Sequence, residues 1–109
     1  TILFTGATAS LRGRPGMAAF AGAKFALRAL SQSMARELGP EGIHVAHVIV
    51  DGAIDMPWIR ENFPQIVEER GEEALLKPDA IAESYWQLHS QPRSAWTHEL
   101  DLRPHIEPW

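Results

Sequence analysis

Residues 17–50 read MAAFAGAKFALRALSQSMARELGPEGIHVAHVIV and join a long helical segment to a strand-like run. The helical part, Met17–Leu38, is rich in Ala, Leu, Met and Arg, which favour helices. Gly39-Pro40 ends it, with glycine at the C-cap and proline beyond. The β-branched run Ile43–Val50 is typical of a strand that is buried on both faces. A helix followed directly by a buried strand predicts an α/β fold with a parallel sheet.

The flanking segments continue this alternation of strands and helices. In chain order we expect a strand at Thr1–Phe4, a loop at 5–16, a loop at Asp51–Pro57, a mobile flap with short helices at roughly 55–77, a helix at Pro78–Ser90, a strand at Trp96–Leu102 and a tail at 103–109. The order predicts about three parallel strands joined by right-handed crossovers, with residues 1–109 forming a single partial domain. With so few strands, at least one sheet edge should lie open or be covered by another chain.

Composition excludes several classes of function. The net charge is −4 and the basic residues are scattered, which argues against nucleic-acid binding. There is no cysteine, so disulfides, thiol catalysis and thiolate metal sites are excluded. The five histidines have no metal-site spacing, and we expect no metal. No apolar run is long enough for a membrane span and no signal peptide opens the chain, so a cytoplasmic location is the default expectation. The abrupt start inside an apolar run, without Met, suggests a piece of a longer protein.

Four local patterns occur in an order that identifies a family. They are Ala18–Leu27, which contains Phe20-x-x-x-Lys24; Gly39–Val45; Asp51–Pro57; and Ala95-Trp96-Thr97. Together they resemble the C-terminal half of the short-chain dehydrogenases/reductases: the Tyr-x-x-x-Lys helix, the turn before the sixth strand, the Pro-Gly-x-Ile-x-Thr-Pro segment and the Trp-Thr-Gly entry to the last strand. The resemblance covers essentially the whole chain and implies half of a Rossmann-like, doubly wound parallel sheet, with a long helix and a second helix.

The proton-transfer residues of that family are replaced in this sequence. Phe20 stands at the position of the catalytic tyrosine, and Ala7 stands at the position of the catalytic serine, 13 residues earlier. Thr8 and Ser10 are nearby hydroxyls at other offsets, and Ser10 is a possible substitute proton donor. Phe20 is open to two interpretations, as an ordinary core residue or as part of the active-site lining.

The cofactor side of the family's site is better preserved. By resemblance, Lys24 would bind the nicotinamide ribose of NAD or NADP, and the backbone of Gly52 and Ile54 would bind the carboxamide. Asp51 replaces the usual proline; it would either favour the oxidised, positively charged nicotinamide or only cap its loop. Met56 replaces the usual threonine, and Trp58 lies where the substrate flap begins, so both are candidates for a substrate pocket.

The resemblance implies an NAD(P)-dependent oxidoreductase acting on a small alcohol or carbonyl compound, with activity reduced or rerouted by Phe20 and Ala7. The alternatives are a non-catalytic relative that works in binding or assembly, and an inactive fragment. A stretch of 109 residues does not form a complete dinucleotide site, so we expect it to be inactive by itself. We also expect a homo-oligomer formed through the long helix and the last strand, with a small-molecule substrate and without nucleic-acid or membrane partners.

Overall fold

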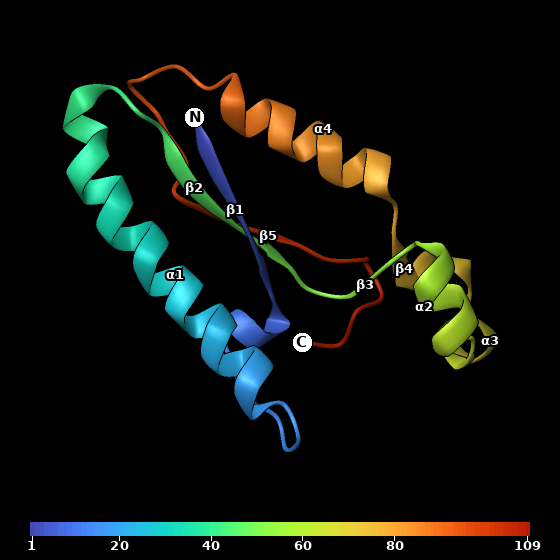
Figure 1. The fold of residues 1–109 in the computed structure, drawn as a ribbon. Coiled ribbons are helices and arrows are strands. Elements are labelled where there is room, and N and C mark those ends of the chain that lie inside the picture. The colour runs from blue at the N-terminus through green and yellow to red at the C-terminus, as the bar shows by residue number, and fades with distance from the viewer.

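A computed structural model describes all residues, 1–109, and shows an α/β fold built on three parallel strands (Figure 1). The strands are β1 (Ile2–Ala7), β2 (Val45–Val50) and β5 (Glu99–Leu102), in the order β1-β2-β5. Helix α1 (Ala18–Leu38) lies on one face of the sheet and α4 (Pro78–His89) on the other. Helices on both faces of a parallel sheet define the expected doubly wound arrangement.

The central strand β2 is buried along its whole length, which explains its continuous apolar run. It pairs with β1 from Ile2↔Val45 to Ala7↔Val50 and with β5 from His47↔Glu99 to Val50↔Leu102. On the α4 side, the fully buried core consists of Ala46, Val48, Val50 and Leu88. The sheet therefore has its apolar centre under α4.

On the opposite face, α1 is attached to the sheet by a charged contact. Nε and Nη2 of Arg28 donate to the two carboxylate oxygens of Glu99 at 2.8 and 2.7 Å. Nδ1 of the fully buried His47 lies 3.1 Å from the same carboxylate. The hydrogen bond from Arg28 lowers the pKa of Glu99 against the opposing effect of desolvation, and His47 lowers it further. The carboxylate is therefore ionised and links α1, β2 and β5.

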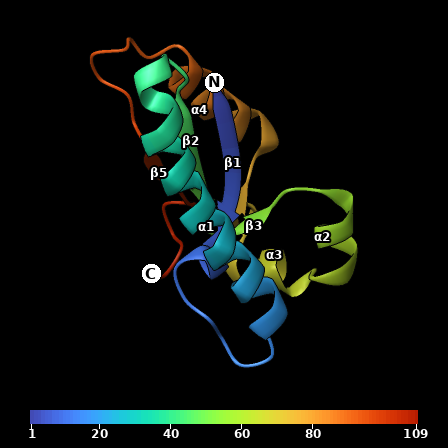
Figure 2. The same ribbon diagram turned by 60° about the vertical axis from the view of Figure 1, so that its left-hand side comes forward.

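The expected flap is a separate small unit with its own pair of strands. Strand β3 (Ala53–Ile54) pairs in parallel with β4 (Leu75–Leu76), so part of the expected Asp51–Pro57 loop is a strand. Between these strands lie the short helices α2 (Pro57–Asn62) and α3 (Gln65–Arg70). Figure 2 shows both helices projecting to one side of the main sheet. A 3₁₀ turn at Glu72–Ala74 completes the flap.

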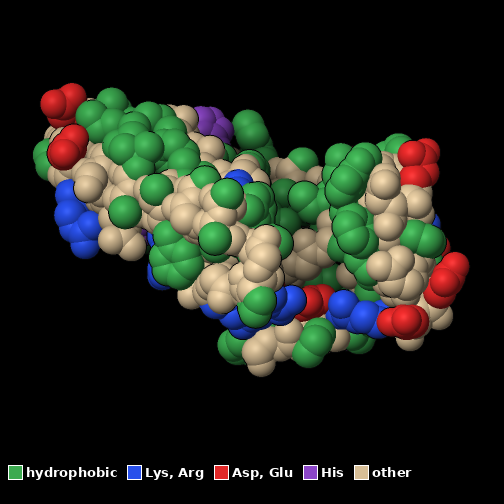
Figure 3. Space-filling view, turned by 60° about the horizontal axis from the view of Figure 1, so that its bottom comes forward, with side chains coloured by type: hydrophobic (Ala, Val, Ile, Leu, Met, Phe, Trp, Pro, Cys, Tyr) green, Lys and Arg blue, Asp and Glu red, His purple; other side chains and the backbone are tan.

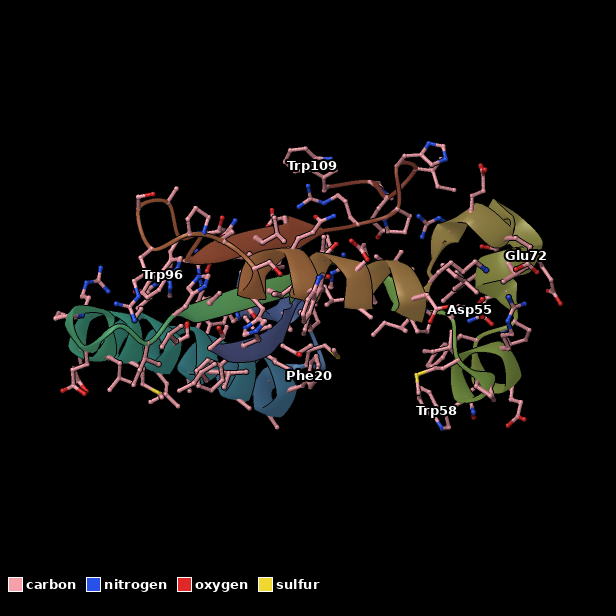
Figure 4. The ribbon with its side chains drawn as sticks, turned by 90° about the horizontal axis from the view of Figure 1, so that it is seen from above. Phe20, Asp55, Trp58, Glu72, Trp96 and Trp109 are labelled. Atoms are coloured by element: carbon pink, nitrogen blue, oxygen red, sulfur yellow. The ribbon has the colours of Figure 1, made fainter.

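An ionic cluster holds the base of the flap together. Arg60 donates to Asp55 and to Glu72, and Nζ of Lys77 lies 2.6 Å from Asp55. Asp55 and Glu72 lie together at this end of the molecule in Figure 4. The hydrogen bond from Arg60, followed by that from Lys77, lowers the pKa of Asp55.

Element boundaries differ from expectation at both outer strands. Strand β1 runs to Ala7 instead of Phe4, because Gly6, where a turn was expected, stays in register with Ile49 of β2. Strand β5 begins at Glu99 instead of Trp96, since Trp96 stacks on His44 at 4.7 Å between ring centroids. Strand β2 begins at Val45, two residues later than expected, although the His44 carbonyl still accepts the N–H of Ile2 at 2.7 Å. Two further 3₁₀ turns lie at Thr8–Ser10 and Gly39–Glu41.

None of the helices combines the length and the apolar character that a membrane span requires.

Candidate functional site

A cavity of about 370 Å³ opens where the carboxyl ends of β1 and β2 meet the flap and the start of α1. Ligands of open α/β sheets bind at this end of the strands, where the loops leave the sheet. Figure 3 shows basic side chains gathered where the α1 side of the molecule approaches the flap. The volume lies within the range of small-molecule sites, roughly 300–1,000 Å³.

Three of the residues singled out from the sequence line this cavity together. Ala7 comes from the end of β1, Phe20 from the first turn of α1 and Gly52 from the loop after β2. The Phe20 ring is 46% exposed, so it forms part of the cavity wall and is not a core residue. The parallel pairing of β1 with β2 brings Ala7 beside Val50, which explains why distant parts of the sequence converge here.

Gly52 lines the cavity in a backbone conformation that side chains rarely adopt. Its φ of 149° is a conformation that favours glycine, and a Cβ atom there would lie 3.1 Å from Cδ of Pro104. The Gly52 N–H has no hydrogen-bond acceptor within the protein. Ile54, by contrast, has its side chain packed against the core under α4 and does not line the cavity.

Lys24 lies one turn after Phe20, beside the cavity wall. Its Nζ donates to the carbonyl oxygen of Thr5 at 2.9 Å and lies 5.8 Å from the centre of the Phe20 ring. An ammonium group has three donors, so two remain for a ligand. The lysine is therefore attached to the end of β1, close to the cavity but outside its lining.

Asp51 is 3% exposed and is the centre of a polar cluster below the cavity. Thr8 Oγ1 donates to its Oδ1 at 2.5 Å, and Arg103 Nε donates to its Oδ2 at 3.2 Å. Burial alone would raise the pKa of Asp51, but the bonds from Thr8 and Arg103 and the charges of Arg103 and Arg12 together lower it. Because an ionised carboxylate only accepts, the Thr8 proton is engaged and only oxygen lone pairs remain for a ligand.

Sequence reasoning gave Thr8 no role, although it lines the cavity and contacts Asp51. The register of the strands could have indicated that Thr8 lies beside Asp51. Ala7 pairs with Val50, so the next residues along these neighbouring strands are Thr8 and Asp51. Recognising this pair required the exact end of β1, which the sequence placed three residues too early.

Ser10, Met56 and Trp58 are not brought to the cavity. Ser10 is fully buried, and its Oγ accepts the Ala7 N–H at 3.0 Å. Trp58 is 56% exposed on α2 and contacts Phe63, with ring centroids 5.5 Å apart. Figure 4 shows Trp58 on the flap, well apart from Phe20. Met56 is also exposed, at the start of α2.

The cavity has cationic walls that sequence reasoning missed. Arg12 and Arg14 precede α1, and Arg70 ends α3. Nη2 of Arg70 lies 2.7 Å from the carboxylate of Glu107, which also lines the cavity. Arg12 and Arg14 have no acidic partner within ion-pair distance. The guanidinium donors of both residues are therefore available to a ligand, although the charge of Arg12 also acts on Asp51.

Comparisons with known proteins bear on the family and the fold of the chain. The model of the family described as enoyl-(acyl carrier protein) reductase matches residues 1–99. The uncharacterized oxidoreductase Lmo0432 of Listeria monocytogenes is 27% identical over 113 residues, covering 99% of this chain and 46% of its own length. The crystal structure of a short-chain dehydrogenase from Rhodopseudomonas palustris is 53% identical, with a TM-score of 0.70, over 95% of this chain and 38% of its own.

A more distant structure shows the same fold. The closed form of a serine dehydrogenase complexed with NADP⁺ is 16% identical and has a TM-score of 0.75 over 99% of this chain and 45% of its own. The chain thus spans less than half the length of each of these relatives.

Proposed function

Because the chain belongs to the short-chain dehydrogenase/reductase family of oxidoreductases, we propose that it provides the substrate side and part of the cofactor side of an NAD(P)-dependent enzyme. The substrate is a small alcohol or carbonyl compound. The observation that carries the proposal is the cavity in which Ala7, Phe20 and Gly52 meet at the carboxyl ends of the strands.

The residues at this end of the sheet fit a nicotinamide nucleotide. The unpartnered Gly52 N–H is a donor for a carboxamide oxygen, and Lys24 Nζ keeps two donors for ribose hydroxyls after its bond to Thr5. A Cβ atom at Gly52 would crowd Pro104, and its φ of 149° is strained for other residues, so glycine is favoured at this position. When bound, the nucleotide would accept or supply the hydride.

The two replacements remove groups that would transfer or stabilise the substrate proton, whereas hydride transfer depends on the cofactor. Phe20 has no exchangeable proton, and loss of a positioned acid or base typically lowers the rate by roughly 10²–10⁴-fold. Ala7 donates no hydrogen bond from its side chain to a substrate oxygen, and such a loss costs a further ~10²–10³-fold. The enzyme is therefore expected to be slow unless another group handles the proton.

A panel of alcohols and carbonyls, assayed with NAD(H) and NADP(H) in the full-length protein, tests the proposal. Cofactor-dependent turnover supports an oxidoreductase. If neither the natural protein nor its Phe20→Tyr/Ala7→Ser variant turns over any compound, the proposed activity is wrong.

A non-catalytic binding or assembly protein is the second candidate. It is favoured by the same two replacements and by the contact between Lys24 and Thr5, which gives the lysine a structural role without any cofactor. Nucleotide binding by calorimetry without turnover in either protein would select this alternative.

We also propose that the protein is a homo-oligomer formed through α1 and β5. Helix α1 exposes two large apolar side chains, Phe25 at 44% and Leu30 at 49%. Strand β5 lies at an edge of the sheet, with one side unpaired.

A further inference from the structure

We propose that the substrate of this site is an anionic alcohol: a molecule that carries a hydroxyl group, an apolar body and a carboxylate or phosphate group. This inference rests on the proposed function, because it specifies the substrate class of the same cavity. Three features of the cavity lining lead to it.

The first feature is the pair of free cations. Arg12 and Arg14 line the cavity without a direct ion pair, although the charge of Arg12 also acts on the buried Asp51, whereas Arg70 is paired with Glu107. A guanidinium group binds carboxylate and phosphate oxygens through paired N–H donors, and such charge-assisted bonds are stronger than neutral ones. These two residues give the cavity lining donors that match an anionic group.

The second feature is the apolar surface next to these cations. Met17 and Phe20 from the start of α1 and Ile66 from α3 line the same cavity, and Phe20 is about half exposed. A free inorganic anion would leave this surface in contact with water. A ligand with a hydrocarbon or aromatic body covers it and gains the free energy of apolar burial.

The third feature determines whether the reacting group of the substrate must donate or accept a hydrogen bond. Thr8 lines the cavity, and its proton is donated to the ionised Asp51 at 2.5 Å. Its remaining lone pairs accept hydrogen bonds. A substrate hydroxyl satisfies them, whereas a carbonyl oxygen, which is only an acceptor, does not. Thr8 is thus a positioning residue that favours the alcohol over the carbonyl.

Binding is measured on the full-length protein without nucleotide, by calorimetry, so that the result is independent of turnover. The probes are 3-phenyllactate, its methyl ester, 3-phenylpropanoate and 2-phenylethyl phosphate. The ester tests the effect of the negative charge, 3-phenylpropanoate tests the effect of the hydroxyl, and 2-phenylethyl phosphate tests the kind of anionic group. We expect 3-phenyllactate to bind at least about tenfold more tightly than its ester, since charge-assisted hydrogen bonds contribute that much.

The variant Arg12→Gln/Arg14→Gln should abolish the difference between acid and ester. Arg36→Gln is the matched control, because Arg36 is an exposed arginine in the last turn of α1. Thr8→Val should abolish the advantage of 3-phenyllactate over 3-phenylpropanoate, while Thr8→Ser should keep it. Preference for the carboxylate or the phosphate probe identifies which anion the site accepts, and either preference supports the proposal.

Equal binding of acid and ester, or discrimination that survives in the double arginine variant, would overturn the anionic part. Equal binding of 3-phenyllactate and 3-phenylpropanoate would overturn the role of Thr8. Arginine-dependent binding without any turnover would leave this inference standing and remove the proposed enzymatic function. Turnover of neutral alcohols alone would support the proposed enzymatic function and overturn this inference about an anionic substrate.

Discussion

A Cβ atom at Gly6 would lie only 2.3 Å from Nε2 of His47, so the strand and the buried imidazole fit together because position 6 has no side chain. His47 is fully buried, and its ring is fixed on the other side by the carboxylate of Glu99. A side chain at position 6 would therefore require the imidazole or the strand to shift.

Gly6→Ala should destabilise the protein by about 1–3 kcal/mol, the usual cost of overpacking a close-fitted interior. Urea denaturation of the full-length protein measures the change. Gly22→Ala is the control, because a Cβ atom at Gly22 meets nothing within 4 Å and alanine favours the helix. An unchanged stability of Gly6→Ala would mean that His47 adopts another position.

Phe20→Tyr should raise the rate of hydride transfer, because it places a phenolic hydroxyl at the wall of the cavity, one turn from Lys24. The expected gain is at least about tenfold in kcat, below the full effect of a positioned acid or base. Steady-state kinetics at several pH values measure it. Phe25→Tyr adds the same hydroxyl elsewhere on the exposed face of α1 and should leave kcat unchanged.

Asp51→Asn should cost about 1–3 kcal/mol, because it removes the charge from a buried group that accepts hydrogen bonds from Thr8 and Arg103. Thermal or chemical denaturation tests this value. Asp101→Asn removes the other carboxylate that contacts Arg103, but Asp101 is exposed, and the expected loss is below about 1 kcal/mol. Equal losses of stability in the two variants would contradict the larger contribution expected of the buried Asp51.

The flap should loosen in acid. The pKa of Asp55 lies below its ordinary value of 3.8 in the folded protein, so its ion pairs contribute fully above that value. The contribution is lost as the pH falls through the lower, folded-state pKa. Hydrogen exchange of flap amides between pH 6 and pH 2 would show the change, with the main sheet as an internal reference. Asp55→Asn should show faster exchange already at neutral pH.

Leu30→Glu should weaken or abolish self-association, because it puts a charge into the exposed apolar face of α1. Light scattering coupled to size exclusion measures the molar mass. Trp58→Glu is the control, since Trp58 is also a large exposed apolar residue but lies on the flap. A mass unaffected by Leu30→Glu would exclude this part of α1 from the interface.

The sequence predicted the three strands of the main sheet and its two long helices, but it missed the short strands β3 and β4 of the flap. Helix α1 has high helix propensity and a Gly39-Pro40 stop, and β2 has a continuous apolar run. The ends of β1 and β5 were missed because non-local contacts determine them: Gly6 accommodates His47, and Trp96 stacks on His44.

The candidate site was predictable only in part. The convergence of Ala7, Phe20 and Gly52 followed from resemblance, since each belongs to a recognised motif. Thr8 and the arginines at positions 12 and 14 belong to no motif, and the cavity they line exists only in three dimensions. Met56 and Trp58 were assigned by their position in the chain, and the fold of the flap decides where they lie.

The bond between Lys24 and the Thr5 carbonyl also bears on how such sequences evolve. A residue that serves both the scaffold and a ligand remains under selection when one of the two demands lapses. In a lineage where phenylalanine has replaced the tyrosine, persistence of the lysine therefore carries little information about surviving chemistry. The position of Phe20 is more informative, because its side chain is about half exposed at the cavity.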